Sequence, residues 1–175
     1  MARIQYATKE TATGKSKEYL EKMEERGVPI LNMFRTVLKS PTVGPAFLRL
    51  GVALLEKDDL SPILREIAIL RVGHLTKAHY EWTQHVRIAL ECGVTQAQVD
   101  AIAGDWKNSG QFTEEALAVI QFTDEITQNV KASDAAFAAV RKFMSEQVVL
   151  ELTVTIGFYN MVSRILETME VELES

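Results

Sequence analysis

The sequence contains a single cysteine, Cys92, among 175 residues. One cysteine excludes an internal disulfide framework and any Cys-x-x-Cys couple within the chain. Cys92 stands next to Gly93, at the expected end of a helix, where free cysteines are commonly small buried residues. We therefore expect Cys92 to be a packing residue rather than a nucleophile.

An excess of basic residues is also absent. The 19 Lys and Arg residues are fewer than the 24 Asp and Glu residues, and the net charge is −5. Without a basic stripe, nucleic acid is not an expected partner. No apolar run is long enough to span a bilayer, and the start MARIQYATKE lacks the apolar core of a signal peptide. We expect a cytoplasmic protein with no membrane partner.

No stretch alternates strictly between apolar and polar residues, which is the pattern typical of strands. Apolar residues recur instead at helical spacing, so the sequence predicts an all-α protein. With 47% hydrophobic residues, the chain can bury a core as one domain spanning residues 1–175. Residues 1–15 lack a clear period, and we expect them to form a loose arm that lies across a partner subunit.

Several helix ends are marked by capping residues. Ser61 and Pro62 begin a helix, and Gly93 ends the one that follows it. Gly73 and Thr76 predict a break between these two helices near residues 75–77. Further signals are a capping box of Thr95 and Gln98, an N-cap at Thr113, a helix beginning at Ser133-Asp134, and a turn at Lys57-Asp58-Asp59.

The side chains best suited to chemistry gather in residues 61–93. Glu66 interrupts an apolar helix face, and Glu81 lies four residues before His85 on the next helix. A carboxylate beside an imidazole in a dry site makes a proton donor and acceptor that works near neutral pH. A histidine on an apolar face is also found as a satisfied core residue, so both interpretations stand for His85.

The pattern formed by these residues resembles a known family. Leu64-Arg65-Glu66, Ile69-Leu70-Arg71-Val72, Tyr80-Glu81-Trp82-x-x-His85 and Ala89-x-x-x-Gly93 resemble the carboxymuconolactone decarboxylase branch of the alkylhydroperoxidase-D-like superfamily. Residues 29–50 and 151–166 resemble its flanking helices. The resemblance implies an alkylhydroperoxidase-D-like helical bundle, a homo-oligomer (trimer or hexamer), and sites close to subunit contacts.

In the peroxidase branch of that superfamily, two cysteines stand between the glutamate and the histidine. Aligning Glu66 and His85 with those two residues places Ala78 and Glu81 where the cysteines would be. A thiol peroxidase needs one thiolate to attack the peroxide and a second thiol to resolve the sulfenic acid. Cysteine-based peroxidase activity is therefore not expected.

The decarboxylase branch implies a carboxy-lyase that uses no cofactor and acts on a small carboxylated or lactone substrate. In this resemblance His85 is the proton donor, Glu66 its partner, and Tyr80 an orienting hydroxyl. Arg71 holds a substrate carboxylate or, equally well, forms an ion pair with Glu66 or Glu81.

The remaining candidates for substrate binding are Glu81, Trp82, Asn160 and Arg164. Asn160 and Arg164 are four residues apart, so they share a helix face that reaches a pocket or another subunit. Trp82 is alternatively a core or interface anchor. Gly157, inside the same helix as Asn160, predicts close approach of another backbone.

Two other functions remain open at this stage. One is a non-catalytic protein of the same fold that binds a small ligand or has a purely structural role. The other is a metal-dependent enzyme, because Glu66, His74, Glu81 and His85 would share one face if residues 66–85 formed an unbroken helix. The predicted break near residues 75–77 disfavours this metal site, and His79 is expected at the surface.

Overall fold

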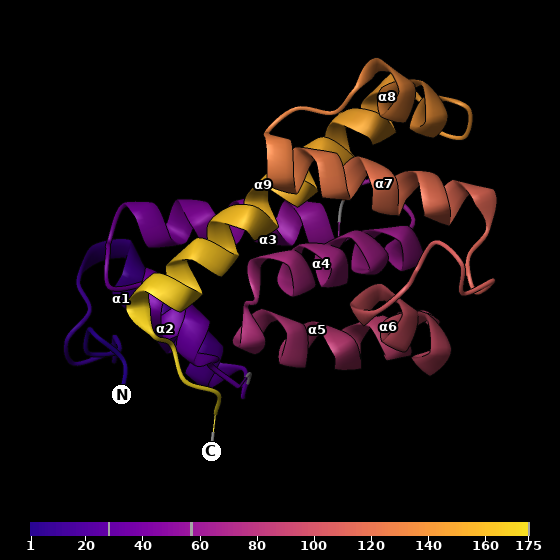
Figure 1. Cartoon of the computed structure of the whole chain (residues 1–175). Helices are drawn as coiled ribbons and strands as arrows, with labels where there is room; N and C mark the ends of the chain where they lie inside the picture. Colours follow the sequence, from indigo (N-terminus) through magenta and orange to yellow (C-terminus); the bar gives the residue numbers. More distant parts are fainter. Residues whose placement is uncertain (28, 57, 175) are drawn as a thin grey trace. The chain divides into compact units, whose positions relative to one another are not determined.

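The computed structural model describes residues 1–27, 29–56 and 58–174 (Figure 1). All regular elements in these ranges are helices, which confirms the predicted all-α class. The chain separates into two compact units, described in turn below. The first comprises residues 1–57 and 166–175, and the second comprises residues 58–165.

The first unit contains three helices, of which α3 is the centre. The helices are α1 (Gly14–Glu25), α2 (Asn32–Val37) and α3 (Val43–Glu56). Both α1 and α2 pack against α3. The contact with α2 is so close that a Cβ atom on Gly44 would lie 2.4 Å from the carbonyl oxygen of Val37. Glycine is therefore the residue that fits at position 44.

The N-terminal residues are bound within this unit, not loose as predicted. The backbone N–H of Arg3 donates to the carbonyl of Met169 (2.9 Å), and the Arg3 guanidinium forms an ion pair with Glu170 (2.7 Å). The Tyr6 hydroxyl accepts from the backbone N–H of Glu172 (3.1 Å). The arm is held by the C-terminal segment of its own chain, and its place across a partner subunit stays a prediction.

The second unit is built around α4 (Pro62–Thr76). Three helices pack against it: α5 (His79–Cys92), α6 (Gln96–Ala103) and α7 (Glu114–Asn129). The unit also contains α8 (Asp134–Arg141), which packs on α7, and most of α9 (Glu146–Met169). Ten consecutive residues of α4, positions 64–73, are buried. A helix covered on all sides is the core of its unit, and any charge it carries must be compensated inside the protein.

Most predicted helix ends are confirmed. The break between α4 and α5 falls at Lys77, which adopts the left-handed conformation (φ 57°), and α5 ends at Gly93 (φ 104°). The capping box of Thr95 and Gln98 is complete, and Thr113 and Ser133 cap α7 and α8. The hydroxyl of Ser61 makes no capping hydrogen bond, although α4 does begin at Pro62. Lys57 of the predicted turn lies outside the described residues.

The longest helix, α9, is the one element in the described ranges that is long and apolar enough to cross a membrane. Half of its apolar window is buried inside the protein, which is also the pattern of a core helix in a water-soluble protein. The close backbone approach predicted at Gly157 is not made within the described residues, because a Cβ atom there would meet nothing within 4 Å.

Two glycine substitutions test the packing of α3 on α2. We expect Gly44→Ala to lower the free energy of unfolding by about 1–3 kcal/mol, because the new methyl group would overlap the backbone of α2. Gly73→Ala is the matched control in another helix: its methyl group would meet neighbours at 3.6 Å or more, so the gain in helix propensity should offset the contact. Urea denaturation measures both, and equal effects would contradict the close contact at Gly44.

Candidate active site

Two helices bring a buried acid–imidazole–acid cluster together. Glu66 comes from α4, and Glu81 and His85 come from adjacent turns of α5. The side chains are almost completely buried, with residue exposures of 0%, 4% and 7%. His85 Nδ1 lies 2.7 Å from Glu66 Oε2, and His85 Nε2 lies 3.2 Å from Glu81 Oε1. The sequence-based expectation that Glu66 and His85 face each other agrees with this geometry.

The two carboxylates contact the imidazole differently. The contact with Glu66 is a short hydrogen bond. The contact with Glu81 is close but misaligned, and Glu81 Oε1 has no hydrogen-bond partner among the described residues. Glu66 therefore fixes the ring, while Glu81 keeps an unsatisfied oxygen beside it.

Burial and the charges of neighbouring side chains shift the pKa values of Glu81 and His85. Burial raises the pKa of Glu81 to about 7, and neighbouring Glu66 adds to the rise, while His85 opposes it. For His85, burial is the largest effect and lowers the pKa, but Glu81 and Glu66 together outweigh it, so the pKa of His85 is raised. Glu81 therefore changes protonation near neutral pH, where general acid–base catalysis is most effective, and His85 holds its proton more tightly than a free imidazole does.

Three further residues of the cluster were not assigned to it from the sequence. Arg65 is buried and lies between Glu66 (Nε to Oε1, 3.4 Å) and Asp58 (Nη1 to Oδ1, 3.7 Å). Tyr159 of α9 packs its ring edge-on against His85, with centroids 4.9 Å apart. Burial and the two glutamates raise the pKa of Tyr159 far above its usual value, so its hydroxyl stays neutral. Two adjacent charges, Arg65 and Glu66, in an apolar helix were the signal that could have revealed Arg65.

The predicted residues Tyr80 and Trp82 lie on α5 near the cluster. Tyr80 is buried, and the aromatic ring that packs against His85 is that of Tyr159. Trp82 is half-buried and lines an open hollow of about 460 Å³. The other residues lining this hollow are Gly73, His74, Lys77, Ala78, His79 and Ala103. A Cβ atom on Gly73 would lie 3.7 Å from Glu81 Cγ, so the Glu81 side chain lies directly behind the wall of the hollow.

Arg71 is part of the core rather than of the cluster. Its guanidinium binds both carboxylate oxygens of Asp124 (2.5 and 3.0 Å) and the carbonyl of Ile102 (2.8 Å). The ion pair of Arg71 is thus with Asp124, not with Glu66 or Glu81. A substrate carboxylate at Arg71 stays a prediction that would require this pair to open.

Asn160 and Arg164 form a local pair on α9. The Arg164 guanidinium donates to the carbonyl oxygen (2.7 Å) and to Oδ1 (2.9 Å) of Asn160. The Asn160 amide donates to Thr127 Oγ1 (3.0 Å) in α7. These hydrogen bonds give Asn160 a structural role, because they join α9 to α7. A role of Asn160 or Arg164 in binding substrate stays a prediction.

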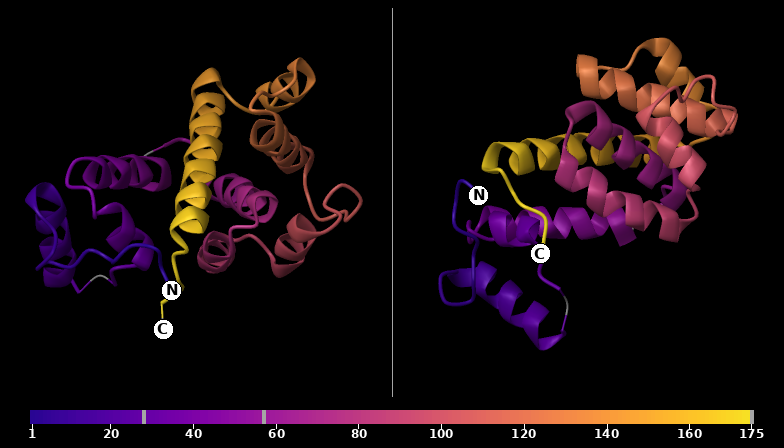
Figure 2. Two further views of the ribbon diagram at one scale, coloured as in Figure 1. Left: turned by 60° about the vertical axis from the view of Figure 1, so that its left-hand side comes forward. Right: turned by 60° about the horizontal axis from the view of Figure 1, so that its bottom comes forward.

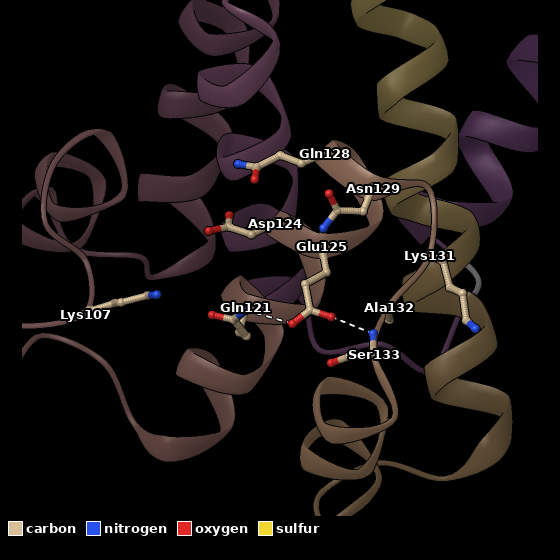
Figure 3. Close-up of a pocket in the computed structure, with 9 residues that line it drawn as sticks. All are labelled: Lys107, Gln121, Asp124, Glu125, Gln128, Asn129, Lys131, Ala132 and Ser133. Atoms are coloured by element: carbon tan, nitrogen blue, oxygen red, sulfur yellow. Dashed lines mark hydrogen bonds between the residues drawn. The ribbon is translucent and has the colours of Figure 1, made fainter.

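A second and larger open hollow, of about 700 Å³, is lined by Lys107 and by residues of α7 and the loop after it (Figure 3). None of the predicted site residues lines it. Its acidic groups are already engaged: Asp124 binds Arg71, and Glu125 accepts from the backbone N–H of Ser133 (2.6 Å) and from the Gln121 amide (2.9 Å). We therefore do not place the chemistry in this hollow, despite its size.

Of the four residues proposed for a metal, Glu66, Glu81 and His85 lie together, and His74 lies apart from them. His74 lies before the break in the chain, where its ring packs near Trp82 with centroids 6.1 Å apart. Both ring nitrogens of His85 face carboxylates. In the part of the chain that the structure describes, no group of three or more His, Cys, Asp or Glu side chains is arranged to hold a metal ion.

Cys92 is not an activated thiol. Burial, followed by the charge of Glu66, raises its pKa. A raised pKa lowers the fraction of thiolate, which is the reactive form.

Three solved structures resemble the fold of this chain. A peroxidase-related protein from Ralstonia eutropha JMP134, described as an alkylhydroperoxidase AhpD core, has a TM-score of 0.84 at 17% identity, and the alignment covers 99% of this chain and 93% of that one. A peroxidase-related protein from Silicibacter sp. TM1040 has a TM-score of 0.82 at 14% identity, covering 99% and 92%. The debrominase Bmp8, a variant solved with 2,3,4-tribromopyrrole, has a TM-score of 0.74 at 18% identity, covering 88% and 82%.

The alignments with the first two structures include the N-terminal arm and most of the acidic tail, which the resemblance in the sequence did not place. A search of curated proteins found no match. Residues 41–125, which contain α4 and α5 and hence the three cluster residues, match the carboxymuconolactone decarboxylase family model. The chain therefore has the alkylhydroperoxidase-D-like helical fold, and within it residues 41–125 resemble the carboxymuconolactone decarboxylase family.

Proposed function

We propose that this protein is a cofactor-independent enzyme that moves protons on a small carboxylated or lactone substrate, as in carboxymuconolactone decarboxylation. The observation that carries the proposal is the buried line Glu66–His85–Glu81, in which one imidazole lies between two carboxyl groups. Such a line can pass a proton from one end to the other without exposing a charge to water.

The three residues have different roles in this proposal. Glu66 fixes the Nδ1 proton of His85 by a 2.7 Å hydrogen bond and so orients the ring. His85 carries the proton between the two carboxyl groups. Glu81, whose Oε1 atom has no hydrogen-bond partner in the described part of the chain, is the group that exchanges a proton with the substrate. This assigns the terminal acid to Glu81, whereas the family resemblance assigned it to His85.

The reaction balances without a cofactor. The bond between the substrate carboxylate and its carbon breaks, CO₂ leaves, and the electron pair moves into the unsaturated carbonyl system of the lactone. The protonated Glu81 then delivers a proton to carbon, and His85 restores that proton from solvent. A substrate in the hollow beside Gly73 and Trp82 would lie next to Glu81.

One observation favours a second candidate, a non-catalytic protein with a structural polar core. Glu66 is fully buried, and the His85 side chain is only 10% exposed. A catalytic role then requires a small opening motion between the hollow and Glu81. The experiments below separate the two candidates, because only the enzyme loses turnover when the cluster is changed.

The first experiment measures CO₂ release from carboxymuconolactone and a panel of related carboxylated lactones. We expect His85→Ala and Glu81→Gln each to lower kcat/KM by about 100-fold or more, the range typical of a lost general acid or base. Cys92→Ser is the matched control on the same helix and should keep wild-type activity, since no thiol takes part. Wild-type turnover in His85→Ala, or no CO₂ release by the native protein from any of these lactones, would overturn the proposal.

The pH profile tests which group donates the proton. Glu81 must be protonated to act as the acid, and its pKa is about 7. We therefore expect kcat/KM to be at its maximum below pH 7 and to fall as the pH rises through that value. A profile that rises through pH 7 instead would show that the ionised carboxylate is required, and the assigned role would be wrong.

The pH dependence of the free energy of unfolding tests the carboxyl group of Glu81 without any substrate. Because burial raises the pKa of Glu81 from 4.5 to about 7, the folded protein binds more protons than the unfolded chain between these values, so stability is lost as the pH rises through that window. Replacing Glu81 with neutral Gln removes this loss. We expect Glu81→Gln to become more stable relative to the native protein by about 2–3 kcal/mol between pH 5 and pH 8.

The matched control for this measurement is Glu91→Gln, an exposed carboxyl group on the same helix. Surface substitutions of this kind usually change the free energy of unfolding by less than about 0.5 kcal/mol. Urea denaturation across the pH range compares the two variants. Parallel stability curves for the native protein and Glu81→Gln would show that Glu81 is not perturbed by burial.

A further inference from the structure

Arg65 is a buried arginine whose two ion pairs are both long. Its side chain is 8% exposed, its Nε atom lies 3.4 Å from Glu66 Oε1, and its Nη1 atom lies 3.7 Å from Asp58 Oδ1. Arg71, on the same helix, instead holds both carboxylate oxygens of Asp124 at hydrogen-bond distance. Long contacts offset less of the cost of burying a charge, so Arg65 stabilises the fold less than Arg71 does. The position of Arg65 points to another role.

The carboxyl group of Glu66 lies between Arg65 and His85. One oxygen, Oε1, faces the guanidinium, and the other, Oε2, lies 2.7 Å from Nδ1 of the imidazole. The proton in this short hydrogen bond can reside on Nδ1 or on the carboxyl group, and the surrounding charges decide which. A cation beside a buried carboxyl group favours its ionised form. Arg65 is placed to bias the proton toward the ring.

We propose that Arg65 is a positioning residue, which keeps Glu66 ionised and so keeps the shared proton on Nδ1 of His85. A neutral ring that is protonated at Nδ1 has an unprotonated Nε2, which can accept a proton. Nε2 faces Glu81 Oε1 at 3.2 Å. If the shared proton moved to Glu66, the neutral ring would carry its own proton at Nε2 and could not exchange one with Glu81. This consequence for catalysis rests on the proposed function, whereas the place of the proton does not.

The other groups near the hydrogen bond do not replace Arg65. The further titratable side chains that face Glu66 or His85 are Glu81 and Cys92 of α5 and Tyr159 of α9. Burial raises the pKa of both the Cys92 thiol and the Tyr159 hydroxyl, so these two groups stay neutral. Burial lowers the pKa of His85, Glu81 and Glu66 raise it, and Arg65 lowers it. Among the described residues, Arg65 is thus the permanent cation that acts on this hydrogen bond.

Asp58 holds the outer end of the Arg65 side chain. The Asp58 side chain is 5% exposed, and its Oδ2 atom has no hydrogen-bond partner among the described residues. Burial raises the pKa of Asp58, Arg65 lowers it, and Glu151 and Asp59 raise it. Figure 2 shows α9, drawn in orange to yellow, as one uninterrupted helix, which carries both Glu151 and Tyr159. Asp58 therefore keeps the guanidinium in place from the side away from the imidazole.

A purely structural ion pair is the competing explanation for Arg65. Removing one member of such a pair lowers stability, because the other member is left buried and unpaired. It does not change which atom of the Glu66–His85 hydrogen bond holds the proton in a variant that still folds. The place of the proton therefore separates the two explanations, and stability does not.

The test is nitrogen-15 NMR of the full chain, which distinguishes a protonated ring nitrogen from an unprotonated one and needs no substrate. Comparison with His85→Ala assigns the signals of His85. We expect Nδ1 to be protonated throughout the neutral range in the native protein. In Arg65→Gln, Nδ1 should lose its proton to Glu66, and Nε2 should carry one. Arg65→Lys keeps the charge and should restore the native signals. The matched control is Arg87→Gln, an exposed arginine on α5, which should change neither nitrogen.

A second variant covers the case in which Arg65→Gln does not fold. Asp58→Asn/Arg65→Gln removes both members of the outer ion pair, so Asp58 is not left as an unpaired charge. It should show the same unprotonated Nδ1, with circular dichroism confirming the fold. Native-like signals in either folded variant, an unprotonated Nδ1 in the native protein, or failure of Arg65→Lys to restore the signals would overturn the proposal.

Kinetics then connect the place of the proton to turnover. For a lactone that the native protein decarboxylates, Arg65→Gln should lower kcat about 10-fold or more, as expected for an impaired acid–base group, and leave KM unchanged. Arg65→Lys should keep most of kcat. A lack of CO₂ release by the native protein would overturn the proposed function alone, because the NMR signals of His85 decide the role of Arg65 independently. Native kcat in Arg65→Gln would overturn the role of Arg65 in catalysis.

Discussion

The structure depends on the compensation of charges inside one fully buried helix. Positions 64–73 of α4 are all buried, and three of them, Arg65, Glu66 and Arg71, are charged. An uncompensated buried charge costs several kcal/mol, so each of these residues dictates a partner elsewhere in the unit. Arg71 fixes α7 and α6 through Asp124 and Ile102, and Glu66 fixes α5 through His85. The helices around α4 are thus positioned by polar contacts as well as by apolar packing.

This compensation is complete at one end of α4 and incomplete at the other. Arg71 has a bidentate partner and a carbonyl acceptor. The cluster around Glu66 includes two buried carboxyl oxygens, one on Asp58 and one on Glu81, with no hydrogen-bond partner in the described residues. Burial raises the pKa of both carboxyl groups. A buried carboxyl oxygen without a hydrogen-bond partner destabilises the fold, which a fully bonded pair such as Arg71–Asp124 does not. A group that exchanges protons with a substrate needs such a free oxygen and a shifted pKa.

The sequence predicted local structure better than it predicted partners. The end of α5, the break at Lys77 and the caps at Thr95, Thr113 and Ser133 follow from one residue and its neighbours, so they could be read directly. The pairing of Glu66 with His85 was also within reach, because both interrupt apolar faces of consecutive helices. The partner of Arg71 was not, since Asp124 is 53 residues away and carries no pattern of its own. The close approach expected at Gly157 is not made within the chain, because the sequence does not show whether a glycine in a helix faces the core or the surface.

Helix α9 forms one wall of the candidate site. Tyr159 packs edge-on against His85 from the buried face of α9, while Gly157 and Met161, two residues away on either side, are exposed. Any shift of α9 would move Tyr159 with the helix. Because His85 is almost sealed, access of a substrate to the cluster requires a small displacement of the surrounding helices. The side of α5 that carries Trp82 faces the hollow beside Gly73, so a displacement there would give the shortest route from the hollow to Glu81.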